Sequence, residues 1–153
     1  MSAGAKASKN GKNFKEQIAT TLRVNGFSEI TKEDMQSLID CEGARLDKKV
    51  FAKNVVLGKN IYSGDWRTDF LYYNGKNFRI LHARWQQVGG SVDEKFPFFV
   101  ANAKKSDKLS IFVLGGDGFK QGARDWLASQ VGLKIVEVFS EEEFQEWAND
   151  GNL

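Results

Sequence analysis

The sequence predicts an α/β protein whose mixed β-sheet is flanked by helices. Two patterns predict this fold class. Asn74-Gly75, a strong β-hairpin signal, separates two strand-like segments. Farther along the chain, strand-like and helical segments alternate as they do in β–α–β crossovers, which give parallel strands. The 153 residues suit one core, so we expect a flexible basic tail at 1–12 and a single domain at 13–153.

The first predicted helix spans Asn13–Asn25. Phe14, Ile18 and Leu22 recur at the spacing that lines one face of a helix. Gly26 follows them, and glycine is the residue that most often ends a helix. The apolar face predicts that this helix packs against the sheet.

A second helix and three strands are predicted next. Lys32–Leu38 has helical spacing, and Thr31 is placed to be its N-cap. The three strands are rich in β-branched and aromatic residues and comprise Val50–Leu57, Thr68–Tyr73 and Asn77–Trp85. The last two flank the hairpin turn, which predicts that they pair antiparallel.

The rest of the chain alternates helices and strands. Ser91 and Glu94 have the spacing of a capping box, which predicts a helix from there to about Ala103. The apolar run Leu109–Leu114 predicts a strand in the middle of the sheet. The remaining predicted elements are a loop at 115–118, a helix at 120–130, a strand at 134–139 and a last helix opened by a capping box at Ser140.

Composition narrows the possible chemistry. No apolar run approaches the ~20 residues of a membrane span, and no leader pattern opens the chain, so we expect a cytoplasmic protein that does not bind membranes. The single cysteine, Cys41, excludes an internal disulfide and a cysteine-based zinc site. The single histidine, His82, excludes motifs with two histidines. Carboxylates, lysines, arginines and His82 remain for catalysis.

Charge is unevenly distributed along the chain. Residues 134–153 hold one lysine and six acidic residues, a net charge of −5. Because the whole chain has a net charge of +2, residues 1–133 carry +7. A basic body suits a polyanionic partner, since Lys and Arg contacts to phosphate supply most non-specific affinity for nucleic acid. An ordinary solvated surface is the competing interpretation.

Three segments of the sequence resemble the PD-(D/E)XK nuclease superfamily, which has the restriction-endonuclease-like fold. They are the first helix with Glu16 and Gly26-Phe27, the segment Asp65–Phe70 with the hairpin and Arg79–Gln87, and the run Gly89–Pro97. The stretch from Trp85 to Pro97 is similar to a branch found in bacterial and phage genomes. The resemblance implies hydrolysis of DNA phosphodiester bonds with Mg²⁺ or Mn²⁺, in a bacterial or phage-infected cell.

The sequence departs from the family at its second-strand motif. Asp69 matches the first acidic residue, but His82-Ala83-Arg84 stands where the family has acid-x-Lys. Because alternate residues of a strand share a face, His82 and Arg84 are expected to lie on the same side of the sheet as each other. We interpret Asp69, His82 and Arg84 as a candidate site. Asp69 is expected to bind the metal together with Glu16, which we expect to face inward from the first helix.

Three explanations of the altered motif remain open. In the first, His82 is a metal ligand or the general base, and Arg84 holds phosphate. The use of a histidine in this fold resembles very short patch repair endonucleases and some homing endonucleases. In the second, Lys95 takes the role of the lysine, or Gln86 completes the metal shell. In the third, the protein binds DNA without cutting it.

The resemblance implies a restriction- or homing-type endonuclease acting on double-stranded DNA. Cleavage of both strands by so small a chain implies a homodimer or higher oligomer. The alternatives are an inactive DNA-binding protein on a nuclease scaffold and a structure-specific nuclease for junctions or flaps. Candidate DNA contacts are Arg45, Lys48, Lys49, Lys53, Lys59, Arg67, Gln86 and Lys95.

Overall fold

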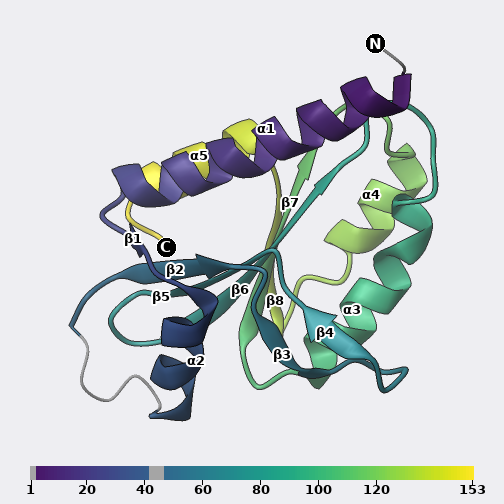
Figure 1. The fold of residues 1–153 in the computed structure, drawn as a ribbon. Helices are drawn as coiled ribbons and strands as arrows, with labels where there is room; N and C mark the ends of the chain where they lie inside the picture. Colours follow the sequence, from purple (N-terminus) through teal and green to yellow (C-terminus); the bar gives the residue numbers. More distant parts are fainter. Residues whose placement is uncertain (1–2, 42–46) are drawn as a thin grey trace.

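The computed structural model describes residues 3–41 and 47–153. Figure 1 shows a twisted sheet with helices on both sides. The helices are α1 (Ala3–Val24), α2 (Lys32–Asp40), the short 3₁₀ helix η1 (Asp93–Lys95), α3 (Phe96–Lys105), α4 (Gln121–Ala128) and α5 (Glu141–Asn149). The strands are β1 (Ser28–Glu29), β2 (Val50–Lys53), β3 (Val56–Lys59), β4 (Asp65–Arg67), β5 (Phe70–Tyr73), β6 (Phe78–Trp85), β7 (Leu109–Gly115) and β8 (Ile135–Ser140).

Six strands form one mixed sheet in the order β1-β2-β5-β6-β7-β8. β2, β5 and β6 pair antiparallel, whereas β6, β7 and β8 pair parallel through the helical crossovers. This arrangement confirms the predicted fold class, and β7 lies inside the sheet as its apolar sequence predicts. The hairpin is confirmed as well: the Asn74 side chain accepts backbone N–H groups of Lys76 and Asn77, and Gly75 has a φ of +92°.

The predicted strand Val50–Leu57 divides into two. Asn54 adopts a left-handed φ of 55°, and the chain turns there out of the large sheet. β3 then pairs antiparallel with β4 in a separate two-stranded sheet. This hairpin lies beside α3 in Figure 1, where the backbone N–H of Ile61 donates to Asn102 Oδ1 at 2.8 Å.

The two faces of the large sheet bury different residues. α1 and α5 run side by side over one face (Figure 1) and cover a core that includes Phe14, Leu81 and Phe144. On the other face, α2 and the β3–β4 hairpin cover the β2–β5 half, and α3 and α4 cover the β7–β8 half. β6 lies between these halves, so its side chains alternate between the two sides of the molecule.

Two further local expectations differ from the structure. α1 begins at Ala3, so helical structure extends through part of the segment that was expected to be a tail. The Ser91 capping box is wrong: no side chain caps η1 or α3, and the Val92 N–H donates to Gln86 Oε1 instead. The capping box at Ser140 is confirmed. Within the described part of the chain, no helix has the length and apolar character needed to cross a membrane.

Candidate active site

Asp69 lies at the edge of the antiparallel hairpin, directly before β5. The pairing of β5 with β6 begins at Phe70, which is opposite Leu81, so the main chain of β5 does not reach farther along β6. Beyond that point the Asp69 carboxylate replaces a main-chain acceptor, because its Oδ2 accepts the backbone N–H of Ala83 at 2.8 Å. Its side chain is 8% exposed. A buried acidic side chain therefore extends the hydrogen bonding of β5.

Two positively charged side chains converge on this carboxylate. Arg84 Nη1 lies 3.0 Å from Oδ1 and 2.9 Å from Oδ2 of Asp69. Lys15, on α1, places its Nζ 2.9 Å from Oδ1. α1 covers one face of the sheet, whereas Arg84 packs over the Phe99 ring of α3 on the other face. The two cations therefore reach Asp69 from opposite sides of the sheet.

The three charged groups differ in their exposure. Asp69 is 8% exposed, whereas the side chains of Arg84 and Lys15 are 24% and 45% exposed. Burial raises the pKa of Asp69, but the charges of Arg84 and Lys15 and the Ala83 N–H outweigh it, so the pKa lies below its usual range. Asp69 is therefore an anion held inside, and its two cationic partners face outward.

His82 lies inside the protein beside this cluster. It is 2% exposed, and its ring stacks with Phe112 at 4.5 Å and with Trp66 at 6.3 Å between centroids. Its Nε2 lies 3.3 Å from Ser110 Oγ. Burial lowers the pKa of His82 to about 4, with Asp69 acting in the opposite direction and Arg84 adding to the decrease. The imidazole is therefore neutral at physiological pH and is held by aromatic packing.

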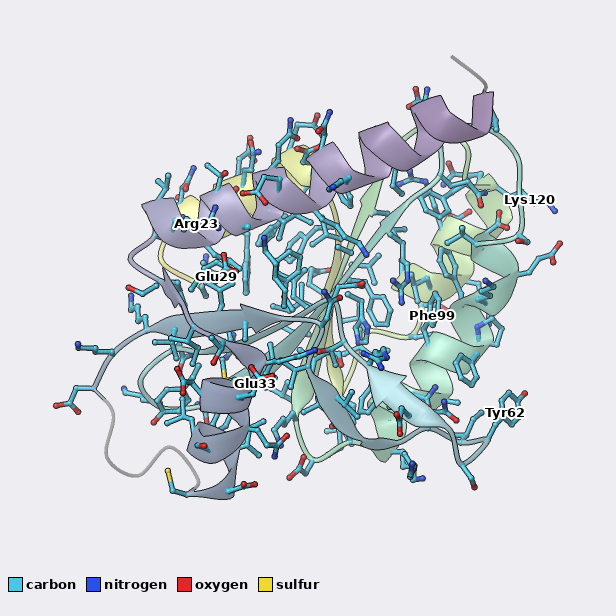
Figure 2. All side chains as sticks on the ribbon, in the orientation of Figure 1. Arg23, Glu29, Glu33, Tyr62, Phe99 and Lys120 are labelled. Carbon is cyan, nitrogen blue, oxygen red and sulfur yellow. The ribbon has the colours of Figure 1, made fainter. Side chains whose placement is uncertain are left out.

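Glu16 points away from the core, which corrects the expectation that it faces inward. Its side chain is 56% exposed and pairs with Arg23 at 2.9 Å and with Lys53 at 3.1 Å. Hydrogen bonds from Arg23 and then Lys53 lower its pKa. Arg23 also pairs with Glu29, and Figure 2 shows these two side chains near the C-terminal end of α1. Both carboxylate oxygens of Glu16 thus have partners outside the Asp69 cluster.

The residues at Asp69 do not fit a divalent cation in the arrangement that the structure has. Mg²⁺ and Mn²⁺ prefer oxygen ligands, usually including one or two carboxylates. Both oxygens of Asp69 already accept hydrogen bonds from Ala83, Lys15 and Arg84, and two positive charges would repel the ion. Across residues 3–41 and 47–153, no group of three or more His, Cys, Asp or Glu side chains is positioned to hold a metal.

Loops after β6 and β7 support the position of Arg84. Gln86, 5% exposed, donates from Nε2 to Gly118 O at 2.9 Å and accepts the Val92 N–H at 2.9 Å. Asp93 accepts the Lys120 N–H at 3.1 Å and so ties the start of α3 to the start of α4. These bonds fix α3, whose Phe99 ring lies 4.5 Å from the Arg84 guanidinium carbon. Figure 2 labels Phe99 on α3 and Lys120 at α4.

Sequence reasoning did not identify Lys15 or Phe99 as parts of the site. Helical spacing carried a signal for Lys15, because it shares a side of α1 with Ala19 and Leu22, both fully buried. Glu16 instead shares a stripe with exposed residues on the same helix. Phe99 had no comparable signal, since its contact with Arg84 depends on how α3 packs on the sheet.

The candidate DNA contacts occupy different parts of the structure. Lys48, Lys49, Lys59, Arg67 and Lys95 are exposed, Lys53 is partly buried, and Arg45 lies outside the described residues. Lys59 pairs with Asp65 at 2.9 Å. The pairing of β2 with β5 places Lys53 opposite Phe70, next to Asp69, while Lys48 and Lys49 precede the other end of β2. Gln86 has its amide partners inside the protein, which favours a structural role.

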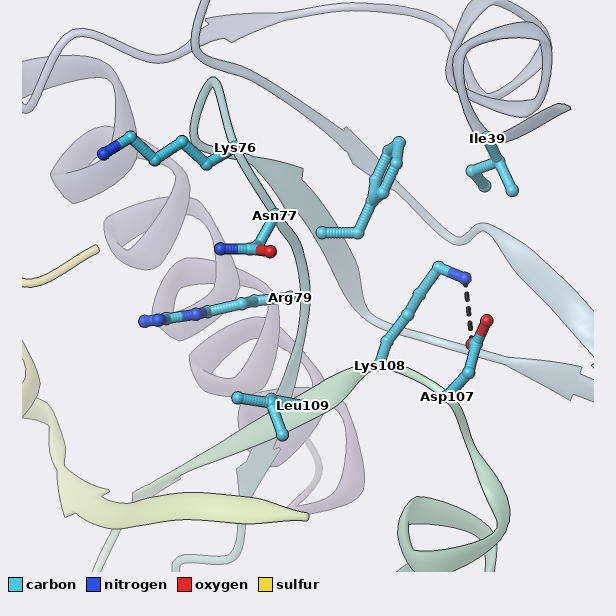
Figure 3. Close-up of a pocket in the computed structure, with 8 residues that line it drawn as sticks. Ile39, Lys76, Asn77, Arg79, Asp107, Lys108 and Leu109 are labelled. Carbon is cyan, nitrogen blue, oxygen red and sulfur yellow. Dashed lines mark hydrogen bonds and ion pairs between the residues drawn. The ribbon is translucent and has the colours of Figure 1, made fainter. Parts of the chain in front are cut away.

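A pocket of about 490 Å³ lies at the far end of β6 from Asp69 (Figure 3). It is lined by Ile39, Lys76, Asn77, Phe78, Arg79, Asp107, Lys108 and Leu109. None of these residues matches a position of the acidic motif. Because Arg84 and Phe78 are at opposite ends of the same strand, this pocket is separate from the Asp69 cluster.

Comparisons with known proteins place the chain in a family. A search of curated proteins finds no match. The crystal structure of a protein of unknown function, AF1548, is similar at 14% sequence identity with a TM-score of 0.38, covering 68% of this chain and 54% of that chain. The present chain thus spans about half the length of that protein. The family model described as the PD-(D/E)XK nuclease superfamily domain matches residues 6–152. With this match over nearly its whole length, the chain belongs to the PD-(D/E)XK nuclease superfamily.

Proposed function

We propose that this nuclease-type domain binds the phosphate backbone of double-stranded DNA at the Asp69 cluster and does not cut it with a divalent metal. One observation carries the proposal: both oxygens of Asp69 accept hydrogen bonds from fixed donors, two of which are cationic side chains. The family's nucleases generally use divalent metals at this position. Here the position next to the carboxylate is already filled by protein charge.

The charge of the surrounding surface supports binding to a polyanion. Lys15 and Arg84 are the members of the cluster that reach the surface, at 45% and 24% exposure, whereas nearby Lys53 is paired with Glu16 and Glu29. Arginine and lysine contacts to phosphate provide sequence-independent affinity for DNA. Exposed lysines and arginines farther away, among them Lys59, Arg67 and Lys95, extend the possible contacts.

A second candidate function is metal-dependent cleavage of double-stranded DNA, as in restriction or homing endonucleases. The retention of Asp69 at the family's acidic position and the family match favour it. Cleavage would require Asp69 to exchange its cationic partners for Mg²⁺ or Mn²⁺. It would also require another ligand, such as Glu16 released from Arg23 and Lys53. Cutting both strands would further require a homodimer.

Parallel binding and cleavage assays separate these functions. The wild type and Asp69→Ala are incubated with supercoiled and linear DNA, with EDTA, Mg²⁺ or Mn²⁺, and binding is followed by fluorescence anisotropy. We expect the wild type to bind duplex DNA and to leave it intact under every condition. Nicking by the wild type that Asp69→Ala abolishes would establish the endonuclease instead. Preferential cleavage of a junction or flap substrate would indicate a structure-specific nuclease.

A further inference from the structure

We infer that Lys15 and Arg84 together replace the divalent cation of the family, so that the Asp69 cluster binds one backbone phosphate directly. The inference rests on the proposed function, which it deepens by naming the two groups that hold the phosphate.

The charge of the cluster equals that of the family's motif with its metal. Two acidic residues, one lysine and one divalent cation sum to a charge of +1. In this chain Asp69, Lys15 and Arg84 also sum to +1, because His82 is a buried, neutral imidazole. Compared with the family motif, this chain has one acidic residue fewer and one cationic side chain more. These two changes together compensate for the two positive charges of the metal. The field presented to a phosphate is thus conserved in sign without a bound ion.

The positions of the three charges direct that field outward. Asp69 lies inside at 8% exposure, and the two cations that it holds are 24% and 45% exposed. An incoming phosphate therefore meets Lys15 and Arg84 before it meets the carboxylate. Asp69 fixes both cations from opposite faces of the sheet, which reduces the side-chain entropy lost when a ligand binds.

Arg84 keeps donor capacity for a ligand. Asp69 accepts only from Nη1 of its guanidinium, which leaves Nη2 outside that ion pair, whereas Nε is buried. The donors of Nη2 can therefore pair with a phosphate oxygen while Nη1 keeps its contact with Asp69. The guanidinium lies over Phe99, and this ring limits its motion without using any of its donors.

Charge-removing variants test this inference on a fluorescein-labelled duplex. Arg84→Gln and Lys15→Gln each remove one of the two cations. Lys76→Gln is the matched control, because it removes an exposed lysine in the turn at the opposite end of the β5–β6 hairpin. Anisotropy is measured in EDTA and in Mg²⁺ over a range of salt concentrations. Thermal melting monitored by circular dichroism establishes that each variant is folded.

We expect wild-type affinity to agree within about twofold between EDTA and Mg²⁺. Arg84→Gln and Lys15→Gln should each weaken binding by about five- to tenfold and lower the salt slope by about one, and Lys76→Gln should change both much less. Equal effects of all three variants, or binding lost in EDTA, would overturn the inference while leaving DNA binding established. Absence of wild-type binding under all conditions would instead reject the proposed function.

Discussion

Arg84 binds the buried carboxylate of Asp69 with a single nitrogen, Nη1, at 3.0 and 2.9 Å from its two oxygens. From the sequence we predict that Asp69 corresponds to the first acidic residue of the superfamily motif and Arg84 to its lysine. Their direct contact, completed by Lys15 from the opposite face of the sheet, gives a cluster with its own balance of charge.

Removal of the carboxylate should destabilise the fold. Asp69→Ala leaves the Ala83 N–H and two cations without their partner, and we expect a loss of about 3 kcal/mol in the free energy of unfolding. Asp69→Asn retains an acceptor for Ala83 and should lose about half as much. Urea denaturation followed by circular dichroism measures both variants. A loss below about 0.5 kcal/mol for Asp69→Ala would show that the cluster is not a stabilising contact.

Asp69 should also contribute to the acid sensitivity of the fold. Its pKa is lower in the folded than in the unfolded chain, because Arg84 and Lys15 outweigh the effect of burial. Its contribution is therefore present above the unfolded pKa of about 4 and is lost as the pH falls through the folded value. Asp69→Asn should flatten this part of the stability profile in urea titrations between pH 2 and 5. An unchanged profile would contradict the assigned ion pairs.

His82 should titrate far below an ordinary histidine. It is the only histidine in the chain, so its imidazole protons give one resolvable set of NMR signals, and we expect a pKa of about 4. The unfolded chain takes up this proton near pH 6.5. Stability from neutral His82 is therefore complete above pH 6.5 and declines by about 3 kcal/mol toward pH 4. A measured pKa of 6 or more would place the ring in contact with water.

Phe99 should act on DNA affinity through Arg84. Phe99→Leu keeps an apolar side chain but removes the aromatic face beneath the guanidinium, and we expect about a threefold loss of affinity for duplex DNA. Phe78→Leu is the matched control, because the Phe78 ring lies beneath a different cation, Lys108, at the end of β6 away from Arg84. In an Arg84→Gln background, Phe99→Leu should have no further effect on affinity. An equal loss in both backgrounds would show that Phe99 acts independently of Arg84.

The sequence was sufficient for the elements that depend on local patterns. The Asn74-Gly75 turn, the Thr31 N-cap and the Ser140 capping box are all present, because each depends on residues a few positions apart. β1 and β4 were missed because both are very short. β1 also depends on pairing with the distant strand β2, whereas β4 pairs with the preceding strand β3. The expected Ser91 cap is absent, since the 3₁₀ helix begins at Asp93 and follows Val92 rather than Ser91. The Val92 N–H is held by Gln86 Oε1, a bond that the spacing of Ser91 and Glu94 does not reveal.

The candidate site was predicted only in part, for a similar reason. Motif spacing placed Asp69 and Arg84 together across the hairpin, where antiparallel pairing brings them close. Motif spacing does not indicate which residue of the first helix contacts Asp69. In the structure that residue is Lys15 rather than Glu16. The surroundings of His82 were also inaccessible, because Trp66 and Phe112 come from two other strands.

Paramagnetic broadening by Mn²⁺ tests most directly whether protein cations have taken the place of the metal at Asp69. The Ala83 amide donates to Asp69 Oδ2 at 2.8 Å, so an ion bound to that carboxylate would broaden the Ala83 amide signal strongly. The exposed acidic residues at the start of α5, Glu142 and Glu143, provide an internal reference for non-specific binding. We predict that Mn²⁺ broadens the Ala83 amide signal no more than the amide signals of Glu142 and Glu143. Selective broadening at Ala83 that Asp69→Asn abolishes would contradict the account.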